Sequence, residues 1–208
     1  MLRAGSFIRY QGLGAGEVVD IVERPFRGKK ARFAVIRFPH RDLQAQVPAE
    51  DPKVLEKMKK LCPARKLRSL LKRIADEDFA QILPRTWDHR EKMGKHKLNR
   101  GGPEEWVELL ASYALAERQG VELVFQDHEL VRQALRLTAA ELACAEGKPY
   151  EEVHAFVEGL YEKASELAVS GDERAHFGSV KDKRRREGEP DGEEGEESLL
   201  AAAAPVGA

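Results

Sequence analysis

The chain has 208 residues, 42% hydrophobic and 34% charged, which is enough for one or two domains with hydrophobic cores. No apolar run reaches the roughly 18 to 20 residues that cross a bilayer, and the first residues lack a signal-like apolar segment, so we expect a cytoplasmic protein without membrane contact. Two cysteines, Cys62 and Cys144, are too few and too distant for a disulfide framework or metal knuckle. We therefore expect no metal and no cofactor, and two small buried thiols.

The first part of the chain has the short, partly alternating apolar segments of β-strands. They are Phe7–Tyr10, Glu17–Val22, Arg32–Phe38 and Leu43–Val47. Turn residues separate them, and this close spacing predicts a small, strongly bent antiparallel β-barrel over residues 1–62. The glycines at 12, 14 and 16 precede Glu17 and a strand rather than a helix, which favours a tight turn over a phosphate-binding loop.

From Asp51-Pro52 onward the pattern becomes helical, with Val54, Leu55, Met58 and Leu61 on one face. Further helices are predicted after Pro63, after Pro103, over residues 127–146 and over residues 151–169. These form a compact all-α domain at residues 63–170, so the fold class is α+β. Residues 171–208 are too polar and too rich in glycine to form a core, and we expect a disordered charged tail.

The net charge of −1 is the sum of unlike parts. Residues 1–103 hold 24 Lys and Arg against 12 Asp and Glu, whereas residues 104–170 hold 5 against 14 and residues 171–208 hold 6 against 10. Such a dipolar chain indicates one face for phosphate or for an acidic protein. Ordinary solvated surface charge is the alternative interpretation.

Trp87 lies in the basic segment Leu83–Lys92, where few apolar neighbours are available. One interpretation is that its indole packs against nearby helices. The other is that it stays accessible beside phosphate-binding cations, as do side chains that insert between bases in a minor groove. Trp106, at helical spacing with Leu109, Leu110 and Tyr113, is predicted to be in the core.

No arrangement of nucleophile, base or metal ligands stands out in the sequence. There is no Gly-x-Ser-x-Gly motif, and the six histidines are scattered. We therefore expect a protein that is not an enzyme, with a small enzyme of unrecognised active site as a remote alternative.

Several landmarks, taken in their order and spacing, resemble the CarD family of bacterial RNA polymerase-binding transcription regulators. They are Gly12–Val18 leading into Ile21, Val47–Glu50, Leu83-Pro84-x-x-Trp87 with Arg90 and Lys92, Leu98 before Gly101, and Ala140–Ala143. The first landmarks are shared with the polymerase-interacting module of transcription-repair coupling factors, whose helicase motor has no counterpart in this sequence. The resemblance covers about residues 5–169.

This resemblance implies a Tudor-like barrel that binds the β subunit of RNA polymerase by adding an edge strand to one of its sheets. The candidate strand carried over by position is Leu43, Gln44, Ala45, Gln46 and Val47, with Arg24 and Gln46 flanking the contact. Relatives often have arginine where this chain has Gln46, so one charged contact is absent.

The resemblance further implies that Trp87 wedges into the minor groove at the upstream edge of the promoter bubble, with Arg85, Arg90 and Lys92 on phosphates. Phosphate contacts set position without reading bases, so promoter DNA would be bound largely independently of sequence. We expect a monomeric, cytoplasmic, nucleoid-associated regulator that stabilises the open promoter complex. The alternative is a polymerase-binding adaptor without direct DNA contact.

Overall fold

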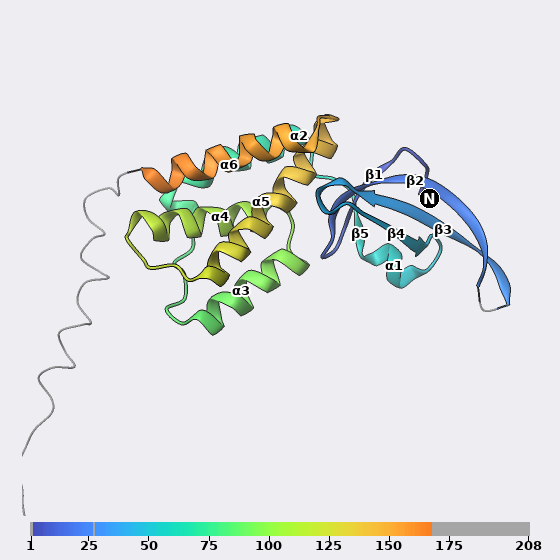
Figure 1. The fold of residues 1–208 in the computed structure, drawn as a ribbon, viewed down its shortest axis with the longest axis horizontal. Coiled ribbons are helices and arrows are strands. Elements are labelled where there is room, and N and C mark those ends of the chain that lie inside the picture. The colour runs from blue at the N-terminus through green and yellow to red at the C-terminus, as the bar shows by residue number, and fades with distance from the viewer. Residues whose placement is uncertain (1, 27, 168–208) are drawn as a thin grey trace, which may run out of the picture. The chain divides into compact units, whose positions relative to one another are not determined.

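The computed structural model describes residues 2–26 and 28–167, which form an antiparallel sheet followed by helices (Figure 1). The predicted α+β class is confirmed. Strands give way to helices between Lys59 and Ala64, and both parts belong to one compact unit. Within the described ranges, no helix is long and apolar enough to cross a membrane. The predicted disordered tail, residues 171–208, lies outside the described residues.

The sheet is a curled half-barrel of five antiparallel strands. The strands are β1 (Phe7–Tyr10), β2 (Gly14–Phe26), β3 (Lys29–Phe38), β4 (Leu43–Pro48) and β5 (Met58–Lys59). Their order across the sheet is β4-β3-β2-β1-β5, so β4 and β5 are the two edges. The barrel expected from the sequence is thus open, because β5 has only two residues and pairs with β1 alone.

The helices are α1 (Pro52–Glu56), α2 (Ala64–Leu71), α3 (Trp87–Arg100), α4 (Pro103–Arg118), α5 (Phe125–Glu146) and α6 (Tyr150–Glu166). The predicted start at Asp51 is confirmed, since its carboxylate accepts a hydrogen bond from the Lys53 amide at 2.9 Å. The predicted continuation to Leu61 is wrong. Helix α1 ends at Glu56, and Met58 and Lys59 extend the sheet by pairing with β1.

Helix α3 was not predicted from the sequence, because its inward face has no apolar periodicity. That face carries Arg90, Gly94 and Leu98, four residues apart and all buried. A Cβ at Gly94 would lie 2.7 Å from a methyl of Leu130, so glycine here allows α3 and α5 to approach closely.

Helix α4 forms the centre of the helical core, with Trp106, Leu109, Leu110 and Tyr113 almost wholly buried. The predicted core position of Trp106 is confirmed. The two cysteines are free thiols, but each is half-buried rather than fully buried as expected.

The sheet packs on α5 through the glycine turn and through a buried carboxylate. Gly14 has a φ of 90°, and a Cβ there would lie 2.7 Å from a methyl of Leu137. Glu141 is fully buried and accepts hydrogen bonds from the Arg9 guanidinium at 3.1 Å and the Cys62 amide at 2.7 Å. Burial raises the pKa of Glu141, and the Arg9 charge opposes that rise. The ion pair joins β1 to α5.

His40 links the turn after β3 to the turn before β2. Its Nε2 lies 2.9 Å from the Leu13 carbonyl oxygen, so Nε2 carries the proton and donates it. Nδ1 is buried without a partner among the described residues. Burial lowers the pKa of His40 to about 4, with a smaller opposing contribution from Leu13 and further lowering by Arg41 and Arg136.

We expect the free energy of unfolding to fall by about 1 to 3 kcal/mol through His40 as the pH decreases from 6.5 to 4. The folded state binds this proton less readily than the unfolded chain, so the stabilisation is complete above pH 6.5 and is lost toward pH 4. Urea unfolding across this range measures it. His40→Gln should show a shallower pH dependence, and an unchanged dependence would contradict the assignment.

Candidate functional site

Trp87 is the first residue of α3, directly after an extended turn. Leu83 is buried at the start of this turn, and the Thr86 hydroxyl lies 2.7 Å from Nδ1 of His89 in the first helical turn. Trp87 is half-buried and packs in part against the helical core. Trp87 therefore shows the core packing of the first interpretation together with part of the exposure that the second requires.

Arg90 does not occupy the phosphate-binding position expected of it. Its guanidinium is buried and pairs with both carboxylate oxygens of Asp127, at 2.9 and 2.8 Å. It also donates to the carbonyl oxygens of Pro84 at 3.3 Å and Arg85 at 3.0 Å. With four donors engaged inside the protein, Arg90 holds the turn that precedes Trp87 and does not reach solvent phosphate.

Asp127 is fully buried and gathers donors from three parts of the helical domain. Besides Arg90, it accepts hydrogen bonds from the Tyr113 hydroxyl and the Val124 amide, both at 3.0 Å. Burial, together with the adjacent Asp127, raises the pKa of Tyr113 well above its usual range. The network joins the starts of α3 and α5 to the middle of α4.

Two of the predicted phosphate contacts, Arg85 and Lys92, are exposed on either side of Trp87 in the sequence. Neither side chain makes an ion pair with any residue that the structure describes. Asp88, also exposed, reduces the positive charge here. A half-buried aromatic residue with two uncommitted cations near it in the sequence is chemically suited to nucleic acid, since an indole offers stacking and cations pair with phosphates.

Phe125 is a candidate that the sequence reasoning missed. It is the first residue of α5, 69% exposed, and the guanidinium of Arg132 lies 5.5 Å from its ring centroid. The Arg90–Asp127 pair ties the turns before Trp87 and Phe125 to one another. Two features of the sequence could have identified Phe125. It stands two positions before Asp127, the aspartate that caps α5, and it falls outside the apolar spacing of that helix.

The predicted polymerase-binding strand, β4, is one of the two edges of the sheet. Strand β4 pairs with β3 from Phe33↔Pro48 to Phe38↔Leu43, and its other side pairs with no strand in the described part. Ala45 and Val47 are half-buried against the sheet core, whereas Leu43, Gln44 and Gln46 are exposed. An edge of this kind can accept another strand.

Arg24 is not brought next to this edge. It lies on β2 opposite Ala31 of β3, so β3 separates it from β4. Gln46 pairs with Val35, whose partner on β2 is Asp20, four residues from Arg24. Arg24 instead lies on the exposed part of the β2–β3 hairpin, beyond the end of β4.

Comparisons with known proteins assign no family to the chain: no family model and no curated protein matches it. Within residues 2–26 and 28–167, no three His, Cys, Asp or Glu side chains are grouped in a way that could hold a metal ion.

Asp127→Asn is expected to lower the free energy of unfolding by about 3 to 5 kcal/mol, because it leaves the Arg90 charge buried without a counterion. Chemical denaturation at pH 7 measures the loss. Glu91→Gln is the matched control, since it breaks the exposed Glu91–Lys95 pair on the same helix and should cost at most about 1 kcal/mol. Equal losses in the two variants would contradict the role assigned to the buried pair.

Proposed function

We propose that this protein is a non-enzymatic accessory factor of RNA polymerase that stabilises the open promoter complex. The incomplete burial of Trp87 at the start of α3, with the exposed cations Arg85 and Lys92 near it in the sequence, is the observation that carries the proposal. The landmarks shared with the CarD family support it. In this scheme the Tudor-like sheet binds the β subunit of polymerase, while Trp87 enters the minor groove at the upstream edge of the bubble.

Such a factor acts by binding alone and catalyses no reaction. Opening the duplex costs a few kcal/mol per base step, and an aromatic side chain that occupies the distorted edge binds the open state better than the closed one. This difference in affinity shifts the equilibrium toward the open complex. Tethering through the sheet raises the local concentration of a weak, sequence-independent DNA contact. A monomer suffices, acting in the cytoplasm on the nucleoid.

The partial packing of Trp87 and the burial of Arg90 favour a second candidate function. In this alternative the protein is an adaptor that binds polymerase without touching DNA. The indole would then serve the helical core, and Arg85 and Lys92 would be ordinary surface charges.

Trp87→Ala distinguishes the two functions. The wedge predicts that polymerase binding is kept while heparin-challenged open complexes decay several-fold faster, because the stacking of one aromatic ring on bases contributes about 1 to 3 kcal/mol. Phe156→Ala, which removes a half-exposed aromatic ring on α6, is the control and should leave lifetimes unchanged. Unchanged lifetimes with Trp87→Ala in a folded protein would support the adaptor.

Proline substitutions in β4 test whether polymerase binds by adding a strand to this edge. Along an antiparallel edge, alternate residues direct their N–H groups toward the neighbouring strand or toward the open side. Of Gln44→Pro and Ala45→Pro, one therefore removes an open-side donor and the other breaks the pairing with β3. The variant with near-native thermal stability is expected to lose binding to the polymerase β subunit in a pull-down. Retained binding by that variant would refute strand addition.

A further inference from the structure

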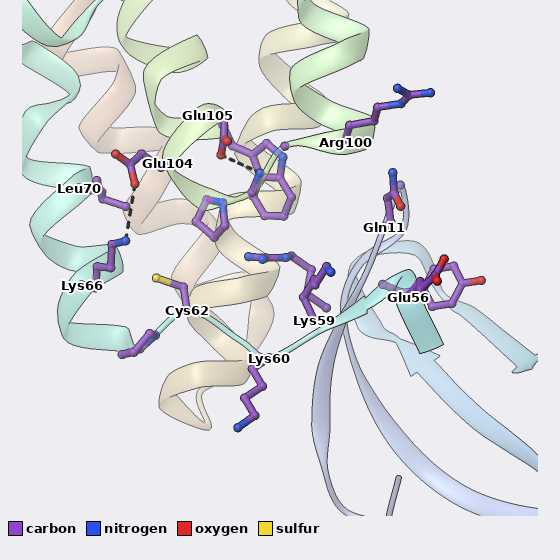
Figure 2. Close-up of a pocket in the computed structure, with 18 residues that line it drawn as sticks. Gln11, Glu56, Lys59, Lys60, Cys62, Lys66, Leu70, Arg100, Glu104 and Glu105 are labelled. Atoms are coloured by element: carbon purple, nitrogen blue, oxygen red, sulfur yellow. Dashed lines mark hydrogen bonds and ion pairs between the residues drawn. The ribbon is translucent and has the colours of Figure 1, made fainter. Parts of the chain in front are cut away.

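The two edges of the sheet are protected against further pairing to different extents. Strand β5 has only two residues, Met58 and Lys59, and the next residue is Lys60. Figure 2 shows both lysines where the chain leaves β5 for α2, beside a cleft of about 540 Å³ whose lining includes Lys59 and Arg100. Short length and lysine side chains are two ways in which natural sheets prevent an edge from accepting another strand.

Strand β4 has neither of these protections. It has six residues and pairs with β3 without a register shift. No charged residue occurs over residues 43–49, although the chain as a whole is 34% charged. Leu43, Gln44 and Gln46 are exposed. A regular, uncharged edge of this length is a template for another strand.

The hydrogen bonds with β3 determine which backbone groups of β4 point outward. The Ala49 amide donates to the Arg32 carbonyl oxygen at 2.8 Å, and this pair continues the register of the β3–β4 ladder. Hydrogen-bonded and non-hydrogen-bonded pairs alternate along such a ladder. The N–H and C=O groups of Gln44 and Gln46 therefore point to the open side. Pro48 falls in the same outward set, where it removes no hydrogen bond from the pairing with β3.

This edge is complementary to itself. When two copies of β4 lie antiparallel with Ala45 facing Ala45 across a two-fold axis, Gln44 of each copy lies opposite Gln46 of the other. The outward N–H and C=O groups then form two symmetry-related hydrogen-bonded pairs. Ala45 is small enough for the approach of about 4.5 Å between Cα atoms that a non-hydrogen-bonded pair requires.

The side chains also match in this register, because opposite residues of an antiparallel pair share one face. On the exposed face, the glutamine amides of the two copies meet. On the other face, Leu43 of one copy meets Val47 of the second, next to the two Ala45 methyl groups. A charged partner strand would instead leave its charge against these residues without a counterion.

We propose that the free protein forms a dimer in which β4 pairs with β4 of a second copy of this chain. The two-fold axis closes the contact on itself, so the assembly stops at two copies. Strands of six residues bury little surface, so the dimer is weak and its population depends on the chain concentration.

The dimer hides the strand that binds the β subunit of polymerase in the proposed function. This consequence rests on the proposed function, whereas the dimer itself does not. Only monomer binds polymerase, so the apparent affinity falls with the monomer fraction as the chain concentration rises. Binding to the β subunit in turn releases the second copy.

Charge substitutions at the two exposed glutamines test the pairing and its register. Gln44→Lys/Gln46→Lys places like charges opposite one another at both positions and should weaken dimerisation about 2- to 30-fold. Gln44→Lys/Gln46→Glu places opposite charges at both positions and should keep or tighten the dimer. Sedimentation equilibrium of the full-length chain at concentrations up to about 1 mM measures the dissociation constant. A native chain that stays monomeric, or weakening by both variants, would overturn the proposal.

Two controls separate this contact from misfolding and from other surfaces. Mixing the Gln44→Lys/Gln46→Lys chain with a Gln44→Glu/Gln46→Glu chain should restore dimers, because each copy then meets opposite charge. Gln11→Lys/Gln126→Lys makes the same charge change at exposed positions outside β4 and should leave the dimer unchanged. Failure of the mixture to dimerise, or equal weakening by the control variant, would place the contact elsewhere and overturn the proposal.

Failure of this proposal is distinguishable from failure of the proposed function. A native chain that is monomeric but loses polymerase binding with Gln44→Pro would overturn the dimer and keep strand addition to polymerase. A dimer that Gln44→Pro disrupts while polymerase binding is retained would keep the dimer and remove strand addition. A β subunit that binds the intact dimer would overturn the masking of β4.

Discussion

The buried pair of Arg90 and Asp127 holds together the end of the helical part where the candidate DNA contact lies. Its two hydrogen bonds and the carbonyl contacts of Arg90 determine the path of the turn before Trp87. Through the Val124 amide the same aspartate also begins α5. A charge buried at this depth is tolerable only because it is paired and hydrogen-bonded. The position of the indole thus depends on an interaction several residues away from it.

A second buried carboxylate, Glu141, plays the corresponding part between the sheet and the helices. It joins Arg9 of β1 and the Cys62 amide to α5, while Leu137 packs against Gly14. The open edge at β4 and helix α3 therefore belong to one compact unit. In the proposed function this matters because a tether is effective only when the linked surfaces can engage their partners together.

Where local chemistry decides structure, the sequence was a good guide. The strands of the sheet, the cap at Asp51, the helix after Pro103 and the core position of Trp106 follow from alternation, capping and spacing within a few residues. Local patterns failed where a distant partner decided the outcome. Met58 and Lys59 continue a helical pattern but pair with β1, and α3 turns a face of Arg90, Gly94 and Leu98 inward.

The sequence by itself determined the α+β class, the uneven distribution of charge and the set of residues from which a DNA or polymerase contact could be built. Only the tertiary structure decided which of these residues are available. Arg90 is withdrawn into an ion pair, Arg24 is separated from β4 by a strand, and Lys59 joins Arg100 at one cleft. The physical reason is that the availability of a charged side chain depends on the partners that folding brings to it, and those partners lie far away along the chain.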